Sequence, residues 1–452
     1  MISNLKYPPA FYKIIGPSII LLGLGLGSGE LILWPYLVSN YGLGIIWAAL
    51  VGITFQFFVN MEIERYSLLY GESIFAGFSR LSKKMPYWFI FSTFIAWMWP
   101  GIIATSAKVF AVLFDIASFD IIGIIFLLLI GMILTAGPRL YKTVESFQMV
   151  LIAVSIPAIA IITFYLTKET DLIALAHGLV GSGEGYKFLP SDIHLFTLLG
   201  AIAYSGAGGN LNLAQSFYIK EKGYGACQNA QGISSIITGQ AQKIKIYGEP
   251  TDFENHHNLI KFKKWWKLVN TEHALVFLLT GAISIILLAL LAYSTTHGMG
   301  VPESVGFLID EYRVISVVIT PAVGVIFLLL VGTLLFGTQL TVLDSTSRII
   351  AENIAILKGK VNLSKLYYLI LWTQIGAGIL IFLIGYTDPV ALVVTGAIIN
   401  AFAMFFHIAA TYFLNQKMLP VDYQISFIRK IILLVTWIFF GILALWAIIR
   451  VF

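Results

Sequence analysis

Eleven long apolar segments dominate this sequence and limit the folds that it can adopt. Each is about the length that a helix needs to cross the hydrocarbon core of a bilayer. Of the 452 residues, 58% are hydrophobic and 11% are charged, whereas soluble domains carry about 25% charged residues. The sequence therefore predicts an all-α integral membrane protein with little soluble domain. The segments are residues 14–38, 43–63, 87–113, 120–137, 146–166, 195–218, 272–295, 315–343, 366–386, 389–413 and 430–451.

The distribution of positive charge predicts an orientation. When eleven segments alternate across the membrane, 23 of the 28 lysines and arginines fall on the side of the N-terminus. Because connections rich in Lys and Arg stay in the cytoplasm, we expect a cytoplasmic N-terminus and an extracytoplasmic C-terminus in the cell membrane. The single cysteine, Cys227, then lies on the cytoplasmic side. The opposite side carries only Lys168, Lys187, Arg313 and Arg450, and Lys108 lies within a segment.

Two of the apolar segments are interrupted by glycines together with polar side chains. Residues 23–30 read GLGLGSGE, and residues 204–212 read YSGAGGNLN. Glycine lets the backbone leave helical geometry, and irregular backbone at membrane depth survives only where it is buried in protein or lines a cavity. Paired interruptions in the two halves of a chain indicate a transporter's binding site. We therefore expect helices 1 and 6 to be broken, with a substrate between the breaks.

The positions of the interruptions divide the eleven segments into five, five and one. Since five is odd, the second set of five must cross the membrane in the opposite sense, which predicts an inverted repeat. We expect a single transmembrane domain over 1–452, with repeats at 14–166 and 195–413 and an extra helix at 430–451.

The connection 219–271 is the largest piece expected in the cytosol. In it, Leu259, Phe262, Trp266 and Val269 share one helical face, and lysines occupy the others. This basic amphipathic pattern is typical of a helix lying on an anionic membrane surface. It equally fits a cap packed under the bundle.

Residues around both interruptions resemble a divergent branch of the Nramp family. The resemblance rests on Gly16 and Pro17 at the entry to helix 1, on GSGE, and on GNLNLAQSFYIKEKGYG. Nramp proteins are proton-coupled divalent-metal transporters with the LeuT-type fold, so the resemblance implies that fold and transport. The GSG of helix 1 also resembles the glycine turn of amino-acid and polyamine transporters, which share the fold.

The resemblance also shows where this chain departs from the Nramp metal site. That site uses an Asp-Pro-Gly-Asn turn in helix 1 and a Met-Pro-His segment in helix 6. Here Gly27 and Glu30 fall where the Asp and Asn would lie, and Gly208 and Asn210 fall near the Met and His. The usual metal-site Asp and Met are therefore missing, and we expect altered selectivity.

Glu30 is the strongest candidate site residue, because a carboxylate near mid-membrane must be protonated, paired or bound to something. Together with Asn210 it offers the oxygen ligands that magnesium and manganese prefer. A structural role, satisfying freed backbone groups, is the alternative for the amides. The expected substrate-binding residues are Glu30, Gly27, Gly29, Gly208, Gly209, Asn210, Asn212 and Gln215.

Five ionisable residues are candidates for a proton or coupling pathway. Lys108 can either pair with Glu30 or reach the membrane interface, and Asp344 can form an i,i+4 ion pair with Arg348. Glu272 and His273 are expected to cap the start of the seventh segment. The pathway candidates are Glu30, Lys108, Glu145, Asp344 and His407.

Together these patterns predict a secondary active, proton-coupled transporter that works by alternating access. The expected substrate is a divalent metal cation such as magnesium or manganese, carried as cargo, with no resident cofactor. The alternatives are an amino acid or small organic acid as substrate, or a receptor-like protein that does not transport. We expect the lipid bilayer and a small ion as partners, no nucleic acid, and no enzymatic activity, since catalytic motifs are absent from the sequence.

Overall fold

The computed structural model describes residues 3–137, 140–228, 230, 232–233, 244–300, 304–359 and 361–451. Within these ranges the regular elements are all helices, and none is a β-strand. Ten of the described helices are long and apolar enough to cross a membrane. The chain is therefore a multi-pass, all-α membrane protein, as its composition predicts.

The first half of the chain contains η1 to α9. The first membrane helix is built from α1, the π-helix η2 and α2 in direct succession. The elements are η1 (Phe11–Lys13), α1 (Pro17–Gly25), η2 (Leu26–Leu33), α2 (Trp34–Tyr41), η3 (Leu43–Ile45), α3 (Ile46–Tyr70), α4 (Ile74–Leu81), α5 (Met85–Trp97), α6 (Gly101–Leu113), α7 (Phe119–Ala136), α8 (Leu140–Leu166) and α9 (Glu169–Leu179).

The second half runs from α10 to α18. Its elements are α10 (Leu195–Ala203), η4 (Gly209–Ala214), α11 (Gln215–Lys222), η5 (Gly225–Cys227), α12 (His256–His273), the π-helix η6 (Ala274–Leu279), α13 (Thr280–Thr296), α14 (Gly306–Val318), α15 (Pro321–Lys358), α16 (Leu363–Ile384), α17 (Pro389–Met418), η7 (Val421–Tyr423) and α18 (Phe427–Val451).

The predicted count of eleven spans differs from these ten helices at the sixth segment. Residues 195–218 form two short helices, α10 and α11, of nine and eight residues. Neither is long enough to cross a bilayer alone, because a helix rises about 1.5 Å per residue. The exact count of eleven therefore stays a prediction.

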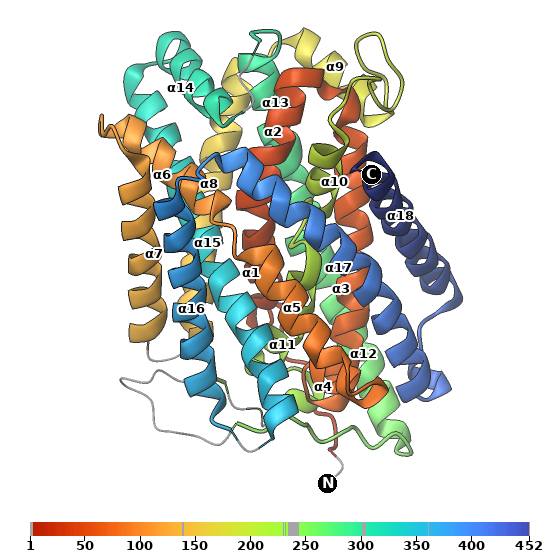
Figure 1. Ribbon diagram of the computed structural model, residues 1–452. Helices are drawn as coiled ribbons and strands as arrows, with labels where there is room; N and C mark the ends of the chain where they lie inside the picture. The colour runs from red at the N-terminus through yellow and green to blue at the C-terminus, as the bar shows by residue number, and fades with distance from the viewer. Residues whose placement is uncertain are drawn as a thin grey trace.

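The first membrane helix lies at the centre of the bundle. Of its apolar window, 94% is buried, compared with 22% for α18 at the periphery. Figure 1 shows α7 and α16 at one edge of the molecule and α18 at the other, with α9 and α14 at the end opposite the N-terminus. This arrangement surrounds the glycine-rich stretch of helix 1 with protein, as a binding site at that position requires.

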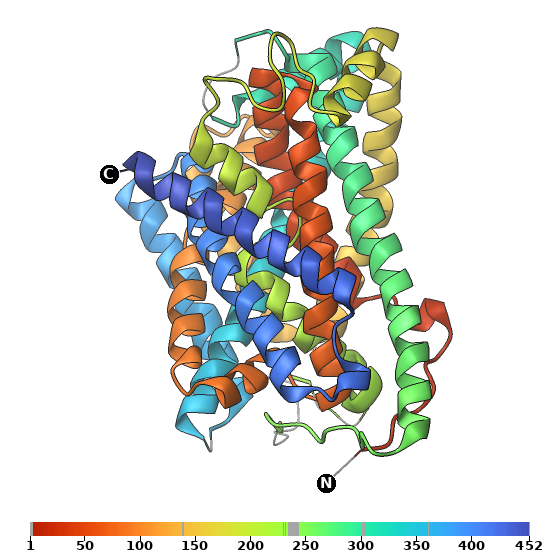
Figure 2. The same cartoon turned by 90° about the vertical axis from the view of Figure 1, so that its right-hand side faces the viewer.

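The helix predicted to begin near residue 272 begins at His256. It continues from α12 through η6 into α13, as the long green helix of Figure 2 shows. Phe262, Trp265 and Val269 are buried, and the Trp265 indole nitrogen donates to the Lys6 carbonyl at 2.9 Å. The amphipathic stretch therefore packs against the bundle, which is the second of the two expected arrangements. Trp265 is buried, whereas Trp266, which we placed on the apolar face, is only partly buried.

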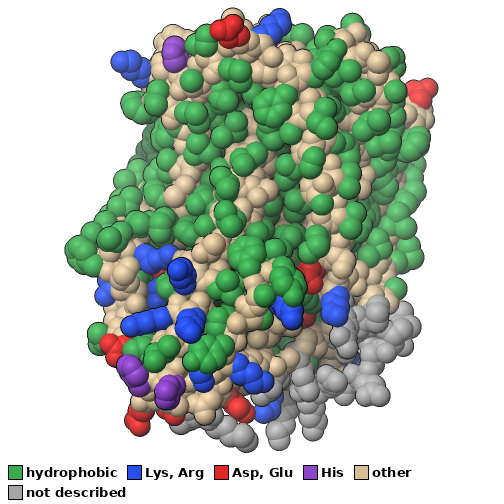
Figure 3. Space-filling model, turned by 180° about the vertical axis from the view of Figure 1, so that it is seen from behind, with side chains coloured by type: hydrophobic (Ala, Val, Ile, Leu, Met, Phe, Trp, Pro, Cys, Tyr) green, Lys and Arg blue, Asp and Glu red, His purple; other side chains and the backbone are tan. Residues whose placement is uncertain are grey.

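The surface divides into an apolar belt and a basic end. Figure 3 shows green hydrophobic side chains over most of one face and blue Lys and Arg side chains gathered at its lower end. The N-terminus lies at that same end in Figure 1. We call this end of the molecule the N-terminal side. A basic end separated from an apolar belt is what the positive-inside rule requires. That the basic end faces the cytoplasm stays a prediction.

Candidate substrate site

The sixth segment is broken where its glycines predicted a break. α10 ends at Ala203, and the chain continues through Gly208 and Gly209, whose φ angles are 77° and 55°. A side chain at such φ values is strained, so glycine is required at both positions. Gln56 of α3 joins the two sides of the break. Its amide nitrogen donates to the Ala203 carbonyl at 3.1 Å, and its oxygen accepts from the Gly208 amide at 3.1 Å.

The first helix differs from the expectation of a break. Residues 26–33 form a π-helix, so the hydrogen-bond pattern of the helix changes but its backbone does not unwind. Gly27 and Gly29 have ordinary helical φ angles. A Cβ atom on Gly29 would collide with the Tyr204 carbonyl, and one on Gly27 with the Thr338 side chain. Gly29 therefore lets the chain at Tyr204 approach helix 1 closely, and Gly27 does the same for α15.

Glu30 lies inside this π-helix and is fully buried. One carboxylate oxygen accepts a hydrogen bond from Ser284 of α13, and the other has no partner. A buried carboxylate with an unpartnered oxygen is costly unless it holds a proton or a cation. Glu30 is therefore a candidate for binding one or the other.

The amides after the break of helix 6 are buried and only partly satisfied. Asn210 donates to Ser92 at 2.8 Å and Thr93 at 2.9 Å, which leaves its side-chain oxygen without a partner. Neither polar atom of the Asn212 side chain has one. The Gln215 nitrogen lies 3.4 Å from a carboxylate oxygen of Glu64, and its own oxygen is unpartnered. Such orphaned acceptors are the ligands that a bound cation requires.

Helix α17 lies against the same break. Asn400 donates to the Tyr204 hydroxyl at 2.8 Å, and a Cβ atom on Gly209 would overlap the Asn400 amide. The oxygen of Asn400 and both ring nitrogens of His407 are buried without partners. The ring of His407 faces the Gly209 backbone. The structure therefore brings His407 to the break of helix 6.

The two residues of the predicted metal pair are held by different helices. Glu30 accepts a hydrogen bond from Ser284 of α13, and Asn210 donates hydrogen bonds to Ser92 and Thr93 of α5. Each of the two residues keeps one side-chain oxygen without a partner. Across the described ranges, no group of three or more His, Cys, Asp or Glu side chains is close enough to hold a metal ion. A cation at this site would be held by one carboxylate together with amide and backbone oxygens.

Lys108 and Glu145 lie away from the break. Lys108 is half-buried on α6, and it does not pair with Glu30, whose partner is Ser284. Glu145 of α8 pairs with Lys222 at 2.5 Å and accepts from Tyr141 at 3.1 Å. Lys222 also donates to the Ile15 carbonyl at 3.2 Å. Glu145 thus helps to anchor the start of helix 1 to α11.

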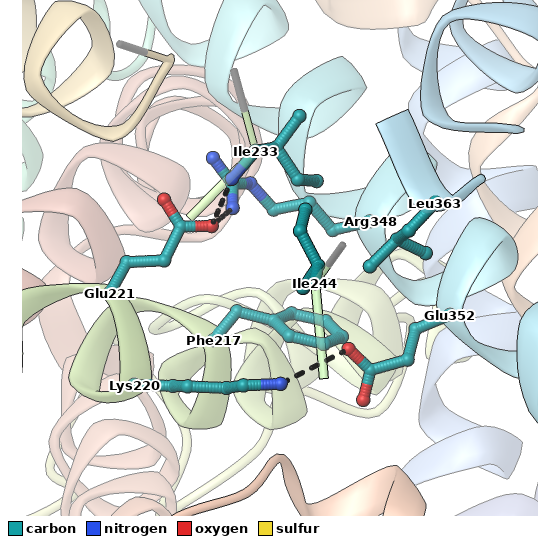
Figure 4. Close-up of a pocket in the computed structure, with 8 residues that line it drawn as sticks. All are labelled: Phe217, Lys220, Glu221, Ile233, Ile244, Arg348, Glu352 and Leu363. Atoms are coloured by element: carbon teal, nitrogen blue, oxygen red, sulfur yellow. Dashed lines mark hydrogen bonds and ion pairs between the residues drawn. The ribbon is translucent and has the colours of Figure 1, made fainter. Parts of the chain in front are cut away.

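Asp344 belongs to an ionic cluster between α11, α15 and α16. Arg348 Nε lies 2.8 Å from Asp344 Oδ1, so the two residues form the i,i+4 ion pair expected from the sequence. Arg348 also pairs with Glu221. Tyr218 and Tyr367 donate to the two oxygens of Asp344 at 3.2 and 2.9 Å. Figure 4 shows Arg348 and Glu221 facing each other beside the Lys220–Glu352 pair around a small cavity. This cluster holds α11 against α15 on the N-terminal side.

The polar face of α3 is a part of the site that we did not predict from the sequence. Gln56, Asn60 and Glu64 follow each other at i, i+4 and i+8, which places them on one side of the helix. All three are buried, and each touches a residue of helix 6 or of the helix that begins at His256. The four-residue spacing of amides and a carboxylate within an apolar segment is the signal that would have found them. Ser284, the partner of Glu30, carries no comparable signal.

Solved structures of three transporters share this arrangement of helices. A variant of the Eremococcus coleocola manganese transporter matches with a TM-score of 0.71 at 14% identity, over 99% of this chain and 89% of that chain. Mhp1, a nucleobase-cation-symport family transporter with bromovinylhydantoin bound, matches with a TM-score of 0.55 at 12% identity, over 98% of this chain and 93% of that one. MhsT in complex with L-phenylalanine matches with a TM-score of 0.53 at 15% identity, over 96% of this chain and 98% of that chain.

At the level of sequence, no protein-family model and no curated protein matches the chain. The likeness is therefore one of fold, and it extends over nearly the whole length of each chain. The neighbours are transporters and not enzymes, in agreement with the sequence analysis. The protein is a multi-pass membrane protein that shares the fold of these transporters.

Proposed function

We propose that the protein is a proton-coupled secondary active transporter of a divalent metal cation that works by alternating access. The observation that carries the proposal is the unpartnered carboxylate oxygen of Glu30, buried in a π-helix that packs against the broken helix 6. A group so placed binds a cation or a proton, and exchange between the two couples their movements.

The donors around the break favour hard cations. The orphaned atoms of Glu30, Asn210 and Asn212 include a carboxylate oxygen and two amide oxygens. Oxygen donors suit magnesium, calcium and manganese, whereas thiolate and thioether ligands select softer metals. The fold's likeness to a manganese transporter supports the same class of substrate. We infer that magnesium or manganese is the cargo, held by Glu30 and Asn210.

A second candidate substrate is an amino acid or small organic acid. Trp97 of α5 stacks on Tyr204 at the break, with ring centroids 5.2 Å apart. Such a pair offers an apolar surface to an organic substrate. The absence of a three-residue metal group within the described chain also leaves room for this candidate.

A binding measurement on the purified protein separates the candidates. A ligand that binds only the folded state raises thermal stability, by about 2.7 kcal/mol at a hundredfold excess over its Kd. We expect manganese and magnesium to raise the unfolding temperature and amino acids to leave it unchanged. Stabilisation by amino acids and not by the two metals would show that the substrate is organic. Uptake of the binding ligand by liposomes then separates a transporter from a receptor-like protein.

A further inference from the structure

Four buried side chains form a continuous hydrogen-bonded row on the N-terminal side of the proposed site. The Ser18 hydroxyl of α1 lies 2.6 Å from a Glu272 oxygen and 2.7 Å from His273 Nδ1. His273 Nε2 lies 3.3 Å from the side-chain nitrogen of Asn60 on α3. Glu272 and His273 lie inside a continuous helix, so the capping role expected from the sequence does not explain them.

The row has two hydrogen-bonding states, because a hydroxyl carries a single proton. In the first, Ser18 donates to the Glu272 carboxylate, His273 Nδ1–H donates to Ser18, and Nε2 accepts from Asn60. In the second, a protonated Glu272 donates to Ser18, and Ser18 donates to Nδ1. Nε2–H then needs an acceptor, which the unpartnered oxygen of Asn60 supplies when its amide rotates. The two states differ by one proton on Glu272 and by the tautomer of His273.

The polar face of α3 connects this row to the break of helix 6. Gln56 bonds both sides of the break, Asn60 faces His273, and Glu64 bonds Gln215. From residue 56 to residue 64 the helix rises about 12 Å. The polar face of α3 therefore leads from the substrate site towards the N-terminal side.

Aromatic rings and one partly exposed lysine lie around the row. Phe57 and Phe277 stack on the two sides of the His273 ring, with centroid distances of 5.6 and 4.6 Å. Lys222 of α11, which is partly exposed, lies within electrostatic range of Glu272. Among the described residues, the other titratable groups that interact with Glu272 are Glu64 of α3, Tyr141 of α8 and Tyr224.

We propose that His273, Ser18 and Glu272 carry the coupled proton over the N-terminal half of its path. A proton arriving from Glu30 through water binds His273 Nε2. The Nδ1–H proton then passes to Ser18, and the Ser18 hydroxyl proton passes to the Glu272 carboxylate. One proton enters at the ring, one emerges as the carboxylic acid, and His273 is left neutral in its other tautomer. Release to water beside Lys222 and reversal of the tautomer complete the step.

The side-chain oxygen of Asn60 is buried without a partner, although such groups are normally satisfied. A relay needs this acceptor, because it receives the Nε2–H hydrogen bond only in the second of the two states. The inference rests on the proposed proton-coupled transport.

The test measures manganese and proton entry in the same liposomes, with acid on the side opposite the N-terminus. Ser18→Ala and Glu272→Gln should lower manganese-coupled proton entry about tenfold or more, the scale of a lost proton-transfer group. Manganese binding and manganese exchange without a pH gradient should stay at the wild-type level. Ser18→Thr, which retains the hydroxyl, should restore coupling. Ser155→Ala and Glu311→Gln are the matched controls, because both residues are buried outside the row.

The outcomes distinguish the relay from the proposed function. Wild-type coupling in Ser18→Ala would overturn the relay and leave the transporter intact. Wild-type protein that moves manganese without protons would overturn the relay as well. Wild-type protein that moves neither manganese nor magnesium would overturn the proposed function. The relay is then judged by proton conductance under a potassium-diffusion potential, and equal conductance in wild type and Ser18→Ala would contradict it.

Discussion

Gly29 of helix 1 lies directly against the backbone carbonyl of Tyr204, the first residue of the break in helix 6. The contact joins the two interrupted segments without any side chain between them. The contact depends on the backbone of both segments. Helix 1 contributes the π-helix at residues 26–33, and helix 6 contributes the non-helical chain after Ala203. This contact links the two halves of the proposed site.

The Gly29–Tyr204 contact predicts the effect of adding one methyl group. Gly29→Ala should destabilise the protein by about 1–3 kcal/mol, because the Cβ meets backbone that cannot move aside. Gly376→Ala in α16 is the control, since nothing lies within 4 Å of a Cβ at that position. Thermal unfolding in detergent measures both. Equal unfolding temperatures for the two variants would contradict the close approach of helices 1 and 6.

The ionic cluster on the N-terminal side predicts a larger loss of stability. Arg348→Met leaves Asp344 and Glu221 buried without their cation, which should cost about 3–5 kcal/mol. Arg313→Met removes the arginine of an exposed pair with Asp310 and should cost less than about 1 kcal/mol. The comparison uses the unfolding temperature. A small loss in Arg348→Met would show that the cluster does not hold α11 against α15.

The orientation calls for a labelling test that avoids Cys227. That residue is buried, and burial raises the pKa of its thiol to about 12, so reagents should react with it slowly from either side. In a Cys227→Ser background, Glu254→Cys and Lys187→Cys place thiols at exposed positions before α12 and before α10. With a cytoplasmic N-terminus, an impermeant reagent labels only the Lys187→Cys protein in intact cells. Labelling of the Glu254→Cys protein alone would reverse the orientation.

A loop on the side opposite the N-terminus should show a weak dependence of stability on pH. The hydrogen bond from Tyr293 and the neighbouring His297 lower the pKa of Glu184. A depressed pKa stabilises the fold above the unfolded value of about 4.3, and the contribution is lost as the pH falls through the folded value. Glu184→Gln should therefore lower the unfolding temperature at pH 7, and the two proteins should converge as the pH falls through the folded-state pKa of Glu184. Because Glu184 is largely exposed, the difference should stay below about 1 kcal/mol.

The exposed Glu254→Gln substitution is the control for that pH series. It should follow the wild-type curve throughout. A Glu184→Gln curve parallel to wild type at every pH would show that Tyr293 and His297 do not stabilise the charge of Glu184.

The sequence predicted the fold because hydrophobicity and charge act on whole segments. Long apolar runs and one-sided lysines specify a bundle, and two glycines at residues 208 and 209 specify a break with positive φ. The same reasoning misjudged Gly27 and Gly29. Glycine serves both for unusual φ angles and for close packing, and only the neighbouring helix decides which.

The site was harder to predict because its contacts join residues far apart in the chain. Ser284 lies 254 residues from its partner Glu30, and no local pattern announces it. Gln56, Asn60 and Glu64 do form a local pattern, but its meaning depends on the helices that face it. Glu272 and His273 were expected at a helix start because the helix was expected to begin near residue 272, not at His256.

The central claim is that the Glu30 carboxylate holds the transported cation, and Glu30→Gln tests it most directly. The substitution removes the charge while nearly preserving shape and the hydrogen bond from Ser284. Manganese and magnesium uptake is measured in liposomes that contain wild type, Glu30→Gln or the buried control Glu311→Gln. We expect Glu30→Gln to lose binding by several kcal/mol, about 3–5, and uptake with it, while Glu311→Gln behaves as wild type. Full manganese or magnesium uptake by Glu30→Gln would contradict the account.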